Sequence, residues 1–139
     1  MNKLFFLLIM FGIFLGCSSK QIKHTENTGG SPQLAIQQEI HNFGTLESGE
    51  IVNFSFKITN SGEGILNIDS VKYSCDCIHV DWPESGISAG NSTFVKITYD
   101  SSGEWGNVYQ TIEIFSNALE TKKNVYIAAK VNNQLFNQE

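Results

Sequence analysis

The sequence contains no arginine, and its 14 acidic residues outnumber its 9 basic residues, all of which are lysine. A chain with this balance lacks the basic surface of a nucleic-acid-binding protein and the polybasic patch that holds a protein on anionic lipids. The sequence also lacks a Ser-His-Asp order, a glycine loop that cradles phosphate and a zinc-protease helix motif. We therefore expect a protein that binds no nucleic acid and is not an enzyme.

Cysteine is scarce as well, with one residue at position 17 and two more at positions 75 and 77. If Cys17 carries lipid, only Cys75 and Cys77 remain. They are two residues apart, so the sequence excludes a disulfide bridge between distant strands. A domain of about 100 residues buries enough surface to fold around a hydrophobic core without such a bridge.

The N-terminal segment has the composition of a secretory signal. Lys3 supplies a positive start, Leu4 to Leu15 form an apolar run, and Gly16 is a small residue before the cysteine. The run is too short for a membrane span, which needs about 20 residues. Ending in Gly16-Cys17, it resembles the lipobox of bacterial lipoproteins, which implies that Cys17 is acylated, palmitate being such an acyl chain. An uncleaved anchor or a plain signal peptide with an incidental cysteine is the alternative.

These features divide the chain into a lipoprotein signal peptide (1–16), a lipidated N-terminus with a flexible linker (17–32), a β-sandwich domain (33–133) and a C-terminal tail (134–139). The linker would hold the domain roughly 20 Å from its anchor on average. Ser18, rather than the aspartate associated with retention at the inner membrane, follows the cysteine. We therefore expect localisation in the cell envelope, on an outer-membrane lipid anchor that faces the periplasm.

From Leu34 onward hydrophobic residues recur with a period of two, which is typical of strands with one buried and one exposed face. The clearest case is 50–60, where Val52, Phe54, Phe56 and Ile58 alternate with polar residues. The same alternation recurs in residues 93–99, 108–114 and 125–131.

The pattern changes between residues 66–68 and 71–73, so we expect a bulge near Asp69-Ser70, with Val71 and Tyr73 in the core. We also expect a leading strand that is split between 34–36 and 40–43. Short strands separated by glycine-containing turns favour an antiparallel β-sandwich.

Several short motifs together resemble one bacterial family, the domain-of-unknown-function 1573 family, over residues 34–131. The motifs are Phe43-Gly44-Thr45, Gly49-Glu50, the run from Phe56 to Gly62, Leu66-Asn67-Ile68, Ser74 to Cys77, Trp82-Pro83, Ala89-Gly90 and Ser116-Asn117. The resemblance implies an all-β fold, an immunoglobulin-like antiparallel β-sandwich of about seven strands, similar to the ASH and MSP domains that serve as adhesion or scaffold modules. The family usually has glycine where this chain has Asp76, and proline-glycine where it has Ala89-Gly90.

The densest group of reactive side chains is Cys75-Asp76-Cys77-Ile78-His79. If this stretch is extended, Cys75, Cys77 and His79 project from one face of the strand. Two thiols and an imidazole suit copper(I) or zinc, and His41 or Asp81 are candidates to complete the site.

Three other readings of the two cysteines stay open. They can be buried thiols that pack like small hydrophobic residues. They can form a local disulfide, but only if the chain kinks, because Cα atoms two residues apart in a strand are roughly 6.6 Å from each other with parallel side chains. They can also cycle as a thiol redox pair, since a kinked bridge should be easily reduced.

The two tryptophans are the candidate binding residues. Trp82 precedes a proline and either caps the sandwich or anchors a partner, whereas Trp105 lies in a glycine-flanked turn and is the stronger candidate for exposure. We interpret the chain as a lipid-anchored, non-catalytic module that binds a protein or an envelope polymer through the loops around Trp82 and Trp105 or through an edge strand. No cofactor is required in this interpretation; soft-metal binding and thiol redox chemistry are the alternatives.

Overall fold

The computed structural model describes residues 30–132, so the expected signal peptide, Cys17 and most of the linker lie outside the described residues. Eight strands are present in this range: β1 (Leu34–Ile36), β2 (Ile40–Glu47), β3 (Ile51–Asn60), β4 (Ile68–Tyr73), β5 (Ile78–Asp81), β6 (Ser92–Asp100), β7 (Gly106–Ser116) and β8 (Lys122–Asn132). Between residues 30 and 132 no helix is long and apolar enough to cross a membrane.

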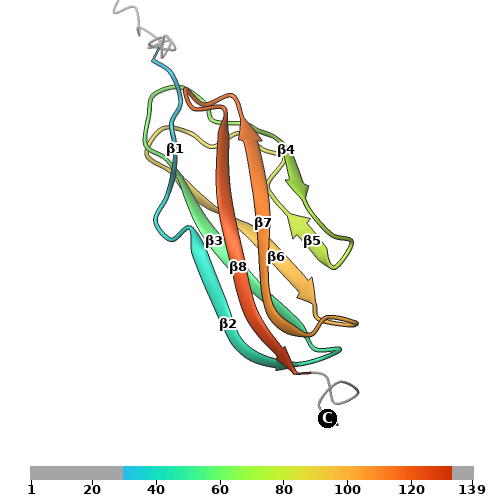
Figure 1. The fold of residues 1–139 in the computed structure, drawn as a ribbon. Coiled ribbons are helices and arrows are strands. Elements are labelled where there is room, and N and C mark those ends of the chain that lie inside the picture. The colour runs from blue at the N-terminus through green and yellow to red at the C-terminus, as the bar shows by residue number, and fades with distance from the viewer. Residues whose placement is uncertain (1–29, 133–139) are drawn as a thin grey trace, which may run out of the picture.

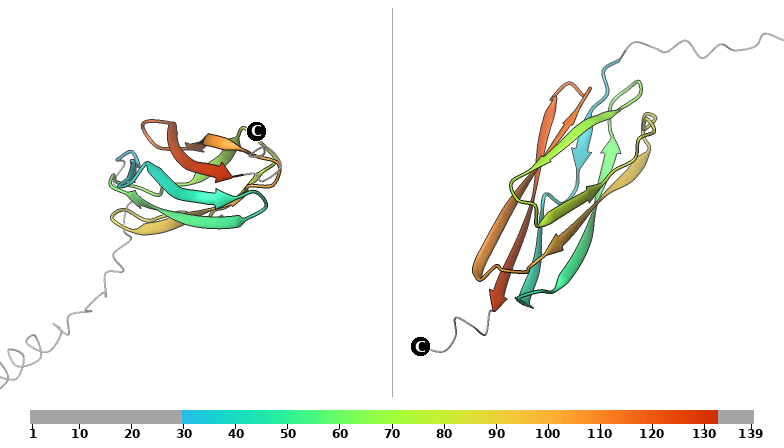
Figure 2. Two further views of the ribbon diagram at one scale, coloured as in Figure 1. Left: turned by 60° about the horizontal axis from the view of Figure 1, so that its bottom comes forward. Right: turned by 90° about the vertical axis from the view of Figure 1, so that its right-hand side faces the viewer.

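The strands form two four-stranded sheets that pack face to face (Figures 1 and 2). Sheet A has the order β1-β3-β6-β5, and sheet B has the order β2-β8-β7-β4. The predicted all-β, immunoglobulin-like sandwich is therefore confirmed. The leading strand is split as expected, and its halves join different sheets: β1 pairs with β3, whereas β2 pairs with β8 in the one parallel pairing of the described residues.

Alternation along each strand builds the core between the sheets. In β3, Phe56 and Ile58 are buried while their neighbours Ser55 and Lys57 are exposed, as the period of two predicts. The expected bulge is also present, because the register of β4 against β7 shifts between Ile68 and Ser70. The prediction for Tyr73 was wrong: it is the last residue of β4, an edge strand that pairs with β7 on one side alone, and it is 42% exposed.

One end of the sandwich, which we call the proximal end, is organised by a buried asparagine. It contains the entering segment 30–33 and the loops 61–67 and 117–121. The Asn60 side chain is fully buried, donates to the carbonyls of Gly64 and Ile87 and accepts from the amides of Gln33 and Gly62. A single side chain thus replaces the backbone partners that these loops lack.

Candidate functional site

The Cys75–Cys77 segment is a tight turn between β4 and β5, not part of a strand. The two sulfurs form a disulfide, and the Cα atoms are 5.1 Å apart, closer than the roughly 6.6 Å of an extended chain. The Ile78 amide donates to the Cys75 carbonyl at 3.3 Å, and the Asp100 amide donates to the Cys77 carbonyl at 2.9 Å. The extended conformation that would place Cys75, Cys77 and His79 on one face is therefore absent, and the chain has the kink that a local disulfide requires.

The expected metal ligands are therefore not gathered at one point. His79 projects from the outer face of β5, where its Nε2 lies 3.1 Å from Oδ1 of Asp81, and both side chains are well exposed. His41 lies on β2, stacked on Phe54 with ring centroids 3.7 Å apart. Burial lowers the pKa of His41. Within residues 30–132, no group of three or more His, Cys, Asp and Glu side chains is placed to hold a metal ion.

The disulfide contributes little to the stability of the fold. It closes a loop of three residues, and on the chain-entropy model such a loop is worth about 1.6 kcal/mol, roughly half the value for a 15-residue loop. The core, in contrast, contains nineteen buried hydrophobic side chains among the described residues. Cys75 and Cys77 are only half-buried at the edge of that core. We therefore expect the fold to persist when the bond is reduced.

The end of the sandwich opposite Asn60, which we call the distal end, contains the loops 48–50 and 101–105. Ser101 is fully buried between them. Its hydroxyl accepts from the Gly49 amide at 3.1 Å and lies within donating distance of the carbonyls of Glu47 and Glu50, at 2.9 and 3.0 Å. The Ser101 amide also donates to the Glu50 carbonyl. The two loops are consequently braced against each other.

This braced end presents two large hydrophobic side chains to solvent. Trp105 is 65% exposed and Ile51 is 66% exposed. Gly103 and Gly106 have φ angles of +77°, which glycine adopts at little cost, so the chain turns sharply on both sides of Trp105. Ile51 pairs with Asp100 at the end of sheet A, so it belongs to the same end of the molecule.

Trp82 does not share this end. It is half-buried, packs against the core and follows the C-terminal end of β5, whereas the loop that carries Trp105 lies beyond the N-terminal end of β5, where Ile78 pairs with Tyr99. The structure thus separates the two predicted binding residues and leaves only Trp105 well exposed.

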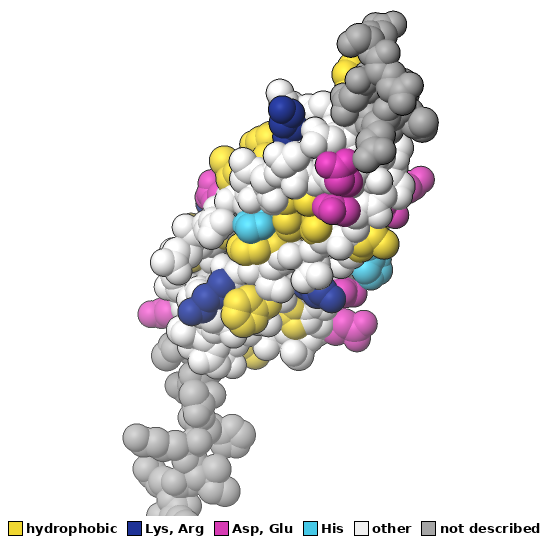
Figure 3. All heavy atoms as spheres, turned by 90° about the horizontal axis from the view of Figure 1, so that it is seen from below, with side chains coloured by type: hydrophobic (Ala, Val, Ile, Leu, Met, Phe, Trp, Pro, Cys, Tyr) yellow, Lys and Arg dark blue, Asp and Glu magenta, His cyan; other side chains and the backbone are white. Residues whose placement is uncertain are grey.

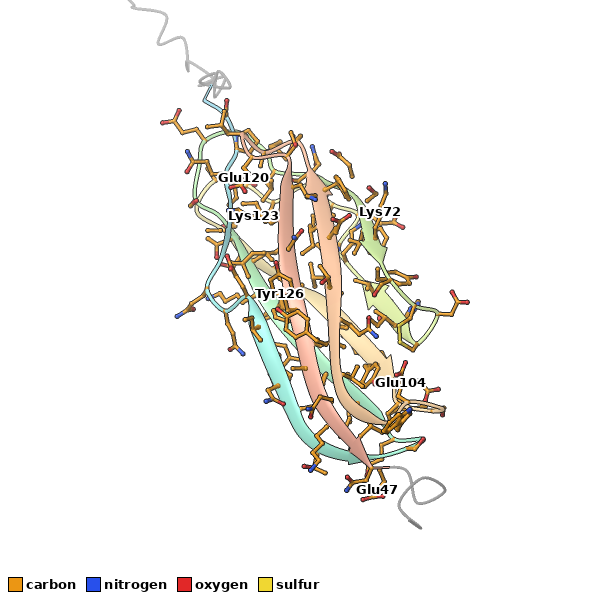
Figure 4. The ribbon with its side chains drawn as sticks, viewed as in Figure 1. Glu47, Lys72, Glu104, Glu120, Lys123 and Tyr126 are labelled. Carbon is orange, nitrogen blue, oxygen red and sulfur yellow. A yellow bond between two sulfur atoms is a disulfide. The ribbon has the colours of Figure 1, made fainter. Side chains whose placement is uncertain are left out.

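Acidic side chains surround the distal end. Glu47 and Glu104 lie there, at the opposite end from Glu120 and Lys123 (Figure 4). Glu50 and Asp100 flank Ile51 in the sequence and in the register. Tyr99, inside the core beside these groups, has a hydroxyl without a hydrogen-bond partner among the described residues. Burial, together with the charges of Glu104 and Asp100, raises the pKa of Tyr99 to about 12.

Sequence reasoning missed a second surface on the outer face of sheet B. Tyr109 and Tyr126 stack there with ring centroids 5.3 Å apart, and Figure 4 places Tyr126 midway along β8. Beside Tyr109 is an open groove of about 460 Å³, lined mainly by small and polar residues: Asn42, Gly44, Thr45, Asn107, Val108, Ala128, Ala129 and Lys130. The available signal was that both tyrosines occupy positions that alternate with core residues, where a polar side chain is usual.

Solved structures with a similar fold come from bacteria and from humans. A protein of unknown function from Porphyromonas gingivalis W83 matches with a TM-score of 0.63 and 21% identity, over 71% of this chain and 46% of that one, so this chain spans less than half of its length. The ASH/PapD-like domain 7 of human CEP192 matches with a TM-score of 0.58 and 13% identity, over 74% of this chain and 87% of that domain.

A third similar structure is the VesB protease of Vibrio cholerae, with a TM-score of 0.56 and 16% identity, over 72% of this chain and 32% of the protease. At these identities the likeness shows the fold alone. No curated protein matches the sequence. The family model described as a protein of unknown function, DUF1573, matches residues 34–131, and the chain therefore belongs to the DUF1573 family.

Proposed function

We propose that this protein is a lipid-anchored, non-catalytic assembly module of the cell envelope that docks onto a protein partner through its distal end. The observation that carries the proposal is that Trp105, on a braced loop, and Ile51, at the start of β3 directly after a braced loop, are large hydrophobic side chains that are each about two-thirds exposed at this end. Tryptophan is enriched among the residues that dominate binding energy in protein interfaces.

The brace matters because ordering a loop on binding costs free energy. The Ser101 hydroxyl and amide already fix the loops 48–50 and 101–105 in the free protein. A partner therefore meets a surface that is held in shape, and less of the interaction energy is lost in ordering it.

The acidic residues at the distal end indicate which kind of protein surface can bind there. Glu50 and Asp100 neighbour Ile51 in the sequence and in the register, Glu104 precedes Trp105, and Glu47 lies at the same end of the molecule (Figure 4). Figure 3, which views the molecule from this end, shows acidic and hydrophobic side chains interspersed, together with a few lysines. The best fit is a protein surface with an apolar pocket and a basic rim, since opposite charges at the rim speed association and favour the correct partner.

The path of the chain is also consistent with docking through the distal end. The described chain begins at Gly30 at the proximal end, whereas β8 ends at the distal end (Figure 1). If Cys17 is acylated, the linker joins the domain at the end away from Trp105. The anchor would then leave the distal end facing the periplasmic space in front of an outer-membrane attachment.

Site-specific photo-crosslinking in cells that make the full chain tests this proposal. A photoreactive phenylalanine analogue replaces Trp105 in one version and Leu119, which is 73% exposed at the proximal end, in the matched control. We expect one discrete protein adduct at position 105 and none at position 119. Adducts at position 119 alone, or equal adducts at both positions, would contradict the assignment of the distal end.

A second candidate function is the binding of an envelope polymer in the groove beside Tyr109. An aromatic ring next to amide, hydroxyl and lysine side chains suits a saccharide with a carboxylate, which would use the ring, Asn42 and Lys130. The test is a titration of the protein with alginate oligosaccharides, followed by NMR. Chemical-shift changes that are confined to the groove, are lost in Tyr109→Ala and are kept in Phe94→Ala on the other sheet would support polymer binding. The absence of chemical-shift changes would contradict it.

A further inference from the structure

We propose that the Cys75–Cys77 disulfide is an exchange site that accepts two electrons from a protein dithiol of the Cys-x-x-Cys class. This inference is independent of docking at the distal end. The Cys75–Cys77 disulfide lies in a partly exposed turn and closes a loop of only three residues, and a bond that stabilises a fold is expected to close a longer loop.

The position makes the bond accessible. The turn joins β4, an edge strand of sheet B, to β5, an edge strand of sheet A, so it lies at the side of the sandwich where neither sheet continues. Cys75 and Cys77 are partly exposed and Asp76 between them is exposed. A partner thiolate can therefore approach the turn without the core opening.

The fold does not depend on the bond. The turn is closed by the backbone bond from Ile78 to Cys75, and it is held against β6 by the bond from Asp100 to Cys77. The strands on either side keep their own partners, since β4 pairs with β7 and β5 with β6. These contacts are made by backbone groups that reduction leaves unchanged. Both redox states should therefore have the same fold, as a reversible exchange site requires.

The chemistry needs nothing beyond the two proteins. A thiolate of the partner attacks one sulfur of the Cys75–Cys77 bond, which breaks; a mixed disulfide forms, and the leaving thiolate takes a proton from water. The second thiolate of the partner then attacks the mixed disulfide and releases the other cysteine, which is protonated in turn. The partner ends oxidised by two electrons with a new disulfide, and Cys75 and Cys77 end as two thiols.

Asp76 is a positioning residue that tunes the rate. Its carboxylate lies between the two cysteines in the sequence and disfavours the negative leaving thiolate. A leaving group that is more readily formed departs faster. Asp76→Asn should therefore accelerate reduction several-fold, an effect that a purely structural role for Asp76 would not produce.

The experiment uses the full chain in detergent with Cys17→Ser, so that Cys75 and Cys77 are the only cysteines. The oxidised protein is mixed with an equimolar amount of reduced thioredoxin, quenched with acid, alkylated with iodoacetamide and weighed by mass spectrometry. Far-UV circular dichroism is recorded before and after. We expect more than half of the chain to carry two alkylated cysteines at equilibrium, with an unchanged spectrum.

Two results would overturn the proposal. If an excess of thioredoxin leaves the bond intact, the bond is not an exchange site. If reduction abolishes the β-sheet spectrum, the bond is a structural staple. The double variant Cys75→Ser, Cys77→Ser is the matched control: it should retain the fold and remain unalkylated, which separates loss of the bond from loss of the structure.

Discussion

The two ends of the sandwich use the same construction and expose different surfaces. Each is organised around one fully buried polar side chain, Asn60 at the proximal end and Ser101 at the distal end. Both side chains bond to backbone groups of loops that no strand pairs. The exposed Leu119 of the proximal end lies beside the entering chain, where its amide donates to Pro32, whereas the exposed Trp105 lies away from it.

The comparison shows that the feature that fixes the loops is distinct from the feature that we propose binds a partner. A buried polar residue in a loop-bearing end explains why the loops are fixed, and both ends have one. What distinguishes the distal end is a hydrophobic pair with acidic neighbours, placed away from the point where the chain enters. The comparison can be tested by weakening each brace in turn and by removing the surface groups alone.

The largest effect on stability is expected at Asn60. Asn60→Ala removes four hydrogen bonds and leaves the Gly64 carbonyl and the amides of Gln33 and Gly62 without this partner, while the Ile87 carbonyl keeps the Leu66 amide, so the free energy of unfolding should fall by about 3 kcal/mol. Urea unfolding measures the change. Asn53→Ala, at an exposed position on the same strand, should change it by less than about 0.5 kcal/mol. A similar loss in both variants would show that Asn60 is no brace.

Ser101→Ala should have the next largest effect, a loss of about 2 kcal/mol, because the buried hydroxyl accepts from the Gly49 amide and donates its one hydrogen to the carbonyl of Glu47 or Glu50. Ser102→Ala, at the exposed neighbouring position, is the control. Ser101→Ala should also increase the motion of Trp105, which fluorescence anisotropy reports when Trp82 is replaced by Phe in both proteins. Unchanged anisotropy together with lost stability would mean that the brace does not hold the tryptophan loop.

Tyr99 provides a smaller effect that depends on pH. Its pKa is raised to about 12 in the folded protein, whereas in the unfolded chain it is near 10. Above pH 10 the unfolded chain loses the proton first, so this group's contribution to stability is complete below pH 10 and disappears as the pH rises towards 12. Urea unfolding across this range should show the decline.

Tyr99→Phe is the matched variant for that measurement. Because the hydroxyl has no partner in the described part of the chain, its removal should change stability at pH 7 by no more than about 1 kcal/mol, in either direction. The decline between pH 10 and 12 should become smaller. An identical decline in both proteins would assign it to other groups.

The strands were predictable because their signal is local. Val52, Phe54, Phe56 and Ile58 alternate with polar residues in the sequence and face the core in the structure. The change of parity near Asp69-Ser70 likewise marks the observed bulge. The order of the strands was not readable from such patterns, since the parallel contact of β2 with β8 joins residues more than eighty positions apart.

The candidate site was predictable only in part, because it depends on contacts between distant segments. The glycines that flank Trp105 indicated an exposed turn, and the structure agrees. Nothing local indicated that Ser101 bonds to the loop 48–50, or that Tyr109 and Tyr126 stack across two strands. The sequence left the conformation of the cysteine segment open, because a strand and a tight turn can both follow Tyr73, and alternation does not distinguish them over three residues.

The most direct test of the central claim is the affinity of the crosslinked partner for two variants, measured by isothermal titration calorimetry once that partner is purified. Trp105→Ala should weaken binding by at least about tenfold, as expected for an interface anchor, while the unfolding free energy stays within about 0.5 kcal/mol of the unmodified protein. Phe94→Ala, which removes an exposed aromatic residue from the outer face of sheet A, should bind like the unmodified protein. Equal affinity for Trp105→Ala and Phe94→Ala would contradict the assignment of the distal end as the docking surface.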